Sequence, residues 1–201
     1  MNKRLRLSLV FLISLMMSGC GLSPVQQDPV AQYTLSQPKQ TSSVIRSRSQ
    51  KTILVSMPVA DPAYASSAMT YMRTPFRVQA FARNRWVAPP SALLAPIMAN
   101  AMRGLQYFKA VIEPPFSGRS DYNLQTQLHV FQQNFQQPVS RFIVSIQASL
   151  VNNSTNQVVA SKRFYQAVPA AGNDPFSGVL AANKAVIAIS HQMAQFVRRS
   201  I

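Results

Sequence analysis

The sequence predicts an α+β domain in which an antiparallel or mixed sheet carries two helices packed on one face, preceded by a flexible N-terminal tether. Three long segments, 121–131, 141–151 and 157–168, alternate apolar and polar side chains, which is the period of a half-buried strand. Two others, 91–105 and 175–198, repeat apolar side chains at the helical period. Because strands, a helix, further strands and a second helix follow one another, the helices are expected to cover a sheet.

Shorter runs predict strands ahead of the long ones. β-branched and apolar side chains are concentrated in residues 52–57, where Pro58 ends the strand because proline cannot donate to a sheet ladder. Residues 69–81 have weaker strand character and predict a hairpin, and residues 108–112 predict one more short strand. These segments would extend the sheet beside the three long strands.

Each predicted helix has a recognisable start. Ser91 is the expected N-cap of the first helix, and Pro96 inside it predicts a kink or a delayed start, because an interior proline loses a hydrogen bond. Asn173 or Asp174 is expected to cap the second helix, with Pro175 at its first position.

The first 20 residues have the three parts of a secretory signal peptide. A basic start, 3–6, precedes an apolar run at 7–17, and Ser18-Gly19-Cys20 closes the segment. A membrane-spanning helix needs about 20 apolar residues, so this run is too short to be one. Small residues before a cysteine form a bacterial lipobox, although Met17 stands where leucine is usual. We expect cleavage before Cys20, the only cysteine in the chain.

Cys20 is therefore the expected lipidation site. Its sulfur would take a diacylglycerol and its freed amine a third acyl chain, and two or more chains anchor a protein stably. Gly21 replaces the aspartate that retains enterobacterial lipoproteins in the inner membrane, which predicts an outer-membrane lipoprotein on the periplasmic face. The predicted organisation is a signal peptide at 1–19, a lipidated flexible tether at 20–50 in which only Tyr33-Thr34-Leu35 is β-prone, and one α+β domain at 51–201.

The composition is strongly basic. Twenty Lys and Arg oppose five acids, for a net charge of +15, and loss of Lys3, Arg4 and Arg6 with the signal leaves +12. Such an excess suggests an anionic partner. An exported lipoprotein does not routinely meet nucleic acid, so lipid headgroups or an acidic protein face are expected. A basic surface that serves only solubility is an equally open interpretation.

The sequence indicates no catalytic or metal site, and we expect no cofactor apart from the covalent lipid. It contains neither a nucleophile elbow nor a glycine-rich phosphate loop. His129 and His191 have no His, Cys or acidic neighbour at metal-ligand spacing, and five acids leave few candidates for acid–base work. We expect a non-enzymatic protein. Trp86 beside Arg85 is a candidate partner anchor, and a core tryptophan is an equal alternative.

Further landmarks follow the lipobox in a defined order: Tyr33-Thr34-Leu35, Ile53-Leu54-Val55, Pro58, Tyr64, Arg85-Trp86, Pro89-Pro90, Leu93-Leu94, Asp121 to Leu124, and the turn from Asn152 to Asn156 before the last helix. This order resembles the ABC-type transport auxiliary lipoprotein family over most of the mature chain. The resemblance implies a non-enzymatic lipoprotein that accompanies an ABC permease, an ATPase and an MCE-domain periplasmic protein. Such systems move phospholipid or other lipid between the two membranes. Tyr64 joins Arg85 and Trp86 as a candidate partner-binding residue.

Three functions are open at this stage. The first is a tethered docking or lipid-handling subunit of an intermembrane lipid transporter. The second is an envelope assembly or structural lipoprotein that stabilises an outer-membrane protein without lipid traffic. The third, and least favoured, is a periplasmic hydrolase. A homo-oligomer is compatible with each of them.

Overall fold

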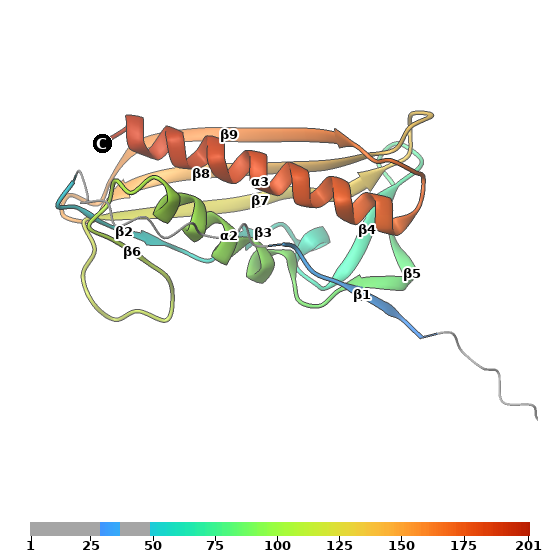
Figure 1. Cartoon of the computed structure of the whole chain (residues 1–201), viewed down its shortest axis with the longest axis horizontal. Helices are drawn as coiled ribbons and strands as arrows, with labels where there is room; N and C mark the ends of the chain where they lie inside the picture. Colours follow the sequence, from blue (N-terminus) through green and yellow to red (C-terminus); the bar gives the residue numbers. More distant parts are fainter. Residues whose placement is uncertain (1–28, 37–48) are drawn as a thin grey trace, which may run out of the picture.

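The computed structural model describes residues 29–36 and 49–201, so the predicted signal peptide and Cys20 lie outside the described residues. Within these ranges nine strands form one mixed sheet, covered by two long helices (Figure 1). The elements are β1 (Ala31–Tyr33), β2 (Thr52–Val55), β3 (Val59–Ala60), the 3₁₀ helix η2 (Pro62–Tyr64), β4 (Ala68–Met72), β5 (Val78–Trp86), α2 (Pro90–Gly104), β6 (Ala110–Ile112), β7 (Tyr122–Asn134), β8 (Arg141–Asn152), β9 (Gln157–Pro169) and α3 (Pro175–Arg199).

Strands β7, β8 and β9 form an antiparallel meander that makes up one half of the sheet, with β9 at its edge. Their bounds confirm the three predicted long strands to within three residues. In β8, Phe142, Val144 and Ile146 are buried on the face toward the helices, while Ile143 and Gln147 on the opposite face are only partly covered. The period-2 pattern of the sequence therefore reports which face meets the core.

The second edge of β7 carries three short strands in succession. β2 pairs with its start, β3 with its middle and β4 with its end, and all three pairs are parallel. β6 then adds to β2, and β5 adds to β4 as the second strand of the predicted hairpin. This arrangement gives the sheet its mixed character, and one long strand organises segments that are far apart in sequence.

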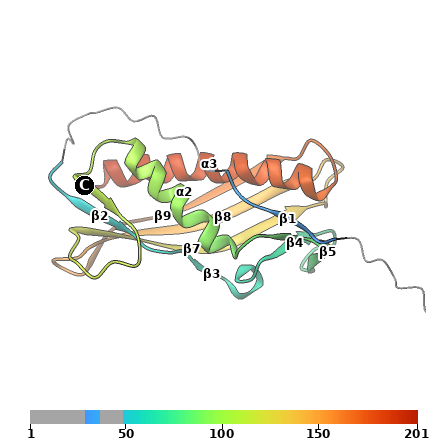
Figure 2. The ribbon, with the colours of Figure 1, turned by 60° about the horizontal axis from the view of Figure 1, so that its bottom comes forward.

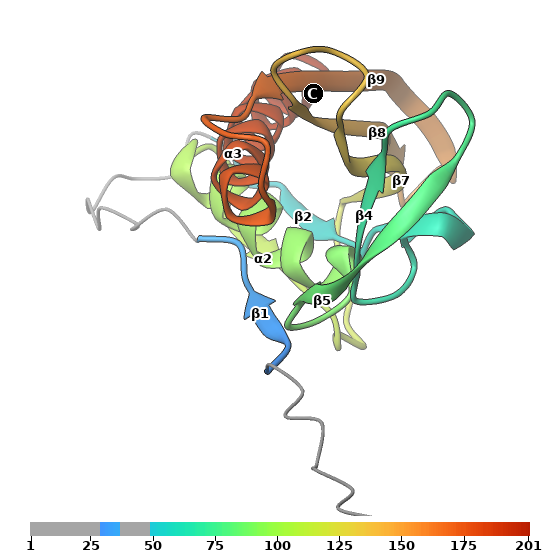
Figure 3. The same ribbon diagram turned by 90° about the vertical axis from the view of Figure 1, so that its right-hand side faces the viewer.

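Helices α2 and α3 lie side by side on the same face of the sheet (Figure 2), which confirms the predicted fold class. Seen along the strands, the sheet curls around the two helices (Figure 3). The core fills the space between them, where α3 contributes Val186, Ile189 and Met193 and α2 contributes Leu94 and Met98.

The helix starts confirm one prediction and correct another. Asp174 caps α3 as expected, because its carboxylate accepts a hydrogen bond from the Ser177 N–H at 2.9 Å. Ser91 is not the N-cap of α2, since the helix begins at Pro90 and Pro89 occupies the cap position without a side-chain bond. Pro96 stays inside the helix, so its lost hydrogen bond does not delay the start.

Strand β1 lies within the range predicted as tether and corrects the extent of that range. It pairs in parallel with the end of β5, and Leu35 just after it is buried in the core. The β-prone triplet at 33–35 therefore docks on the domain, as its composition suggested. Between Cys20 and the first described residue, Pro29, only eight residues remain.

Gly178 is required where α3 crosses β7, because a Cβ there would overlap the side-chain amide of Gln133. Gln133 is fully buried, and its Nε2 donates to Ser140 Oγ at 2.9 Å and to the Asp174 carbonyl at 3.2 Å. Gly178→Ala should displace this amide and lower the free energy of unfolding by about 1–3 kcal/mol, despite alanine's better helix propensity. Urea denaturation measures the change. The control is Gly104→Ala, which meets no atom within 4 Å and should be neutral or stabilising.

Asp121 ties the start of β2 to the start of β7. Its carboxylate accepts hydrogen bonds from the Thr52 N–H at 2.7 Å, from Thr52 Oγ1 at 2.9 Å and from Lys51 Nζ at 3.2 Å. The backbone and hydroxyl bonds from Thr52 and the nearby Lys51 ammonium hold the pKa of Asp121 below its ordinary value of 3.8. The native state therefore gains stability from the charged carboxylate above that value.

That contribution should disappear as the pH falls below 3.8 and through the lowered pKa of the folded state. Asp121→Asn should lower the free energy of unfolding by about 1–2 kcal/mol near neutral pH and make its decline in acid shallower. Urea unfolding between pH 2 and pH 7 measures both effects. A variant whose acid profile superimposes on that of the unsubstituted chain would contradict this account.

Candidate functional site

Two of the three residues predicted to bind a partner are in the core. Trp86, at the end of β5, has 1% of its surface exposed, and its ring packs against Phe131 and Phe142 at centroid distances of 5.3 and 6.2 Å. Tyr64 in η2 is 7% exposed and donates a hydrogen bond from its hydroxyl to Gln132 Oε1 at 3.0 Å. Both side chains belong to the core. This corrects the prediction for Tyr64, and for Trp86 it is the core alternative that the sequence left open.

Arg85 is the member of that set that remains on the surface. Side chains alternate across a strand, so the burial of Trp86 places its neighbour Arg85 on the solvent side of β5. It lies in register with Gln32 of β1 and Ala68 of β4. A contact between Arg85 and a partner stays a prediction.

Each acidic side chain in the described residues is already engaged. Asp61 bonds to Gln127 and His129, Glu113 pairs with Arg103, Asp121 pairs with Lys51, and Asp174 caps α3. Of the 20 Lys and Arg, six lie outside the described ranges, so these four acids face 14 basic residues. The surface of the domain therefore carries a large uncompensated positive charge, and anions are the ligands that it attracts.

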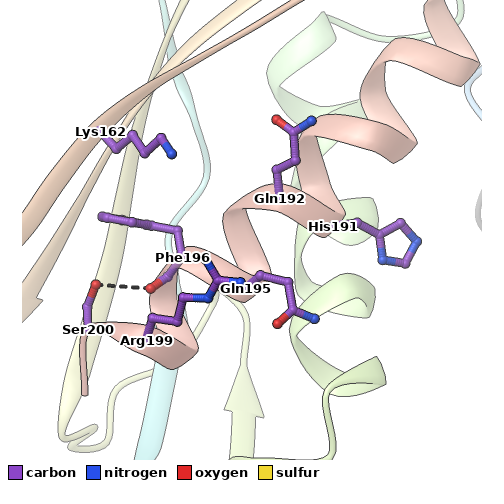
Figure 4. A pocket seen from close by; sticks show the side chains of 7 residues that line it. All are labelled: Lys162, His191, Gln192, Gln195, Phe196, Arg199 and Ser200. Atoms are coloured by element: carbon purple, nitrogen blue, oxygen red, sulfur yellow. Dashed lines mark hydrogen bonds between the residues drawn. The ribbon is translucent and has the colours of Figure 1, made fainter.

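A pocket of about 460 Å³ opens between the C-terminal turns of α3 and strand β9. It is lined by Lys162, His191, Gln192, Gln195, Phe196, Arg199 and Ser200 (Figure 4). Phe196 forms its apolar side and packs edge-on against Phe164 at 5.7 Å, while Lys162 extends over the same Phe164 ring at 5.5 Å. In Figure 4 the His191 imidazole points away from Lys162.

The pocket combines two cations, two amides and an apolar wall. Lys162 and Arg199 can neutralise an anionic group, Gln192 and Gln195 can donate to its oxygens, and Phe196 can contact an apolar substituent. Sequence reasoning missed this site, because Lys162 and Arg199 lie 37 positions apart and only the packing of α3 on β9 brings them together. The available signal was the helical period of residues 175–198, which leaves His191 and Gln195 off the apolar stripe and on a polar face.

His129 has an acidic partner that its sequence neighbours did not reveal. Its Nδ1 lies 3.0 Å from Oδ2 of Asp61, which is 68 positions away and just beyond β3. His129 lies where the β7–β8 register shifts, so a bulge places it in this pair. Hydrogen bonds from Gln127 and then His129 lower the pKa of Asp61 below its ordinary value. The sequence left such a pairing in space open, and the structure supplies it for His129.

The described residues contain no cluster of three or more His, Cys, Asp or Glu that could hold a metal ion. Over the same residues, none of the helices has both the length and the apolar character needed to cross a bilayer.

Residues 33–194 match the family model described as the ABC-type transport auxiliary lipoprotein component. The chain belongs to this family. The resemblance of its ordered landmarks to these auxiliary lipoproteins is thereby confirmed, and the matched range includes most of the sheet and both helices. Comparison with curated proteins finds no match.

Solved structures share the auxiliary lipoprotein fold. A crystal structure of a Xanthomonas campestris protein of family DUF330 superimposes with a TM-score of 0.75 at 21% identity, covering 85% of this chain and 95% of that one. A second, uncharacterised protein gives a TM-score of 0.67 at 12% identity, covering 85% and 99%. At these identities the likeness establishes the architecture of the domain.

Proposed function

We propose that this auxiliary lipoprotein is a non-enzymatic, lipid-anchored periplasmic subunit of an ABC/MCE-type intermembrane lipid transport system, with phospholipid as the cargo. It would hold the MCE-domain periplasmic component at the outer membrane, while the permease and ATPase act elsewhere. The family match over residues 33–194 carries the proposal. Cys20, modified by a diacylglycerol and an N-acyl chain, would supply the anchor.

The surface chemistry supports this assignment. The excess of basic residues over engaged acids suits phospholipid phosphates or an acidic face of the periplasmic component. The pocket between α3 and β9 offers Lys162 and Arg199 to such a phosphate, with Phe196 beside it. Arg85 adds an exposed cation on β5.

Affinity purification from detergent-solubilised envelopes tests the proposal. The tagged full-length chain should recover an MCE-domain protein together with its permease and ATPase. Arg85→Glu reverses one exposed charge without entering the core and should reduce recovery if β5 is part of the contact. Arg119→Glu, in the loop between β6 and β7, is the matched control.

Recovery of an outer-membrane protein without any MCE-domain protein would overturn the proposal in favour of an envelope assembly or structural lipoprotein. The homo-oligomer that the sequence leaves open is tested separately. Native mass spectrometry of the acylated chain in detergent measures the oligomeric state directly, and a strictly monomeric species would exclude a homo-oligomer.

A further inference from the structure

The turn between β4 and β5, residues 73–77, presents a phenylalanine entirely to solvent. Phe76 is 100% exposed and adopts a left-handed backbone conformation with φ of 64°. That region is unfavourable for a bulky side chain and costs of the order of a kcal/mol that glycine would avoid. The turn therefore holds a large apolar group in water on a strained backbone, and nothing within the described domain covers it.

Two cations flank this side chain. Arg73 and Arg77 are both exposed, and the Arg73 guanidinium lies 5.6 Å from the ring centroid of Tyr71 and 5.3 Å from that of Phe135. Tyr71 and Phe135 meet edge-on and, with Phe81, form an aromatic base under the hairpin. The tip of the β4–β5 hairpin therefore carries an apolar side chain between two positive charges, and it rests on a cluster of packed aromatic rings.

The adjacent loop between β7 and β8 also combines an exposed apolar side chain with an exposed cation. β4 and β7 end in register, at Met72 and Asn134, so the two connections lie at the same end of the sheet. In that loop Val139 is also well exposed, and Arg141 follows it as an exposed cation. The acid at this end within the described residues, Asp174, is engaged in the cap of α3.

The first described strand, β1, lies in the same half of the domain as the β4–β5 hairpin. Strand β1 lies with β4 and β5 in the right-hand half of the molecule in Figure 1, and in Figure 3 the β4–β5 hairpin projects upward while β1 lies below β5. Eight residues separate Cys20 from Pro29, and these nine steps along the chain span at most about 30 Å when fully extended. An acylated Cys20 would therefore hold this half of the sheet close to the bilayer. The C-terminal turns of α3, which line the pocket, lie at the other end of the molecule (Figure 1).

We infer that the β4–β5 hairpin is a second membrane contact, in which Phe76 enters the headgroup region of the bilayer and Arg73 and Arg77 lie on lipid phosphates. The inference rests on the lipidation of Cys20 within the proposed function. Apolar burial and attraction to anionic lipid add to acyl insertion. Together they would orient the domain and leave the α3–β9 pocket facing the periplasm.

Brominated lipids test the depth of the hairpin in proteoliposomes that contain the full acylated chain. Phe76→Trp should be quenched by bilayers brominated near the carbonyl end of the acyl chains. Val158→Trp, exposed at the opposite end of the sheet, should not be quenched. The native Trp86 is buried and contributes the same background to both variants. Equal quenching of the two variants, with acylation verified by mass, would overturn the inference and leave the anchor intact.

The Cys20→Ser mature chain separates this inference from the anchor. In co-sedimentation with phosphatidylglycerol-containing vesicles, Phe76→Ser should weaken its binding about tenfold, and Arg73→Gln or Arg77→Gln about fivefold each. Arg119→Gln, exposed in the loop between β6 and β7, is the matched control for charge. Circular dichroism verifies that each variant is folded. Vesicle binding that is unchanged by all three hairpin variants overturns the inference, whether or not Cys20 is acylated in cells.

Discussion

The Cys20→Ser chain is expected to leave the membrane fraction almost completely. Each methylene of an acyl chain that enters the bilayer contributes about 0.8 kcal/mol, so the loss of two or three chains removes many orders of magnitude of membrane affinity. The hairpin contact would replace only a small part of this. Because the sulfur atom is the acceptor of the diacylglycerol, a serine hydroxyl cannot substitute for it.

Flotation of cell envelopes on a density gradient, combined with the mass of the mature N-terminus, measures the effect. The unsubstituted chain should float with outer-membrane markers and carry the mass of a diacylglycerol and an N-acyl chain. Ser23→Ala, three residues away, alters the tether without touching the thiol and should behave like the unsubstituted chain. A Cys20→Ser chain that still floats, from a parent that carries no acyl mass, would contradict the assignment of the anchor.

The Trp86→Ala chain is expected to lose about 3–5 kcal/mol of unfolding free energy. The indole lies between Phe131 of β7 and Phe142 of β8, so its removal leaves a cavity in the centre of the core. Trp86 also ends β5 opposite Tyr33, so the docking of β1 depends on its position. For a domain of ordinary stability this is a large share of the total.

Urea denaturation followed by far-ultraviolet circular dichroism measures the loss, because the chain has no second tryptophan to report by fluorescence. Val87→Ala, at the next position and about half exposed, is the matched control and should change stability by less than about 0.5 kcal/mol. A Trp86→Ala chain of unchanged stability that no longer binds its partner would restore the anchor interpretation that the burial of Trp86 argues against.

The long elements were predictable because each has its own local signal. The alternation in β8 marks its buried face whichever strand lies beside it, and Asp174 with Pro175 marks the start of α3 from adjacent residues. The short strands were harder to place. β2 and β3 contain few residues, and their sequence does not indicate which strand they pair with. Their assignment to successive parts of β7 depends on the whole curled sheet.

The candidate sites divide in the same way. The lipidation of Cys20 stays a prediction, and it depends only on sequence neighbours because a lipobox is a local segment. Two candidate sites join residues from separate elements: the pair of His129 with Asp61, and the pocket lined by Lys162 and Arg199. The spacing of these residues along the sequence does not indicate that they are neighbours in the fold.

Local order in the sequence determined the α+β class, the long strands, the second helix and the expected anchor, since these depend on periodicity and on neighbouring residues. Only the tertiary structure decided that Trp86 and Tyr64 are core residues, that β1 belongs to the sheet, and that Phe76 is fully exposed. Burial and proximity are properties of the packed chain, because they depend on which distant segments exclude water from one another.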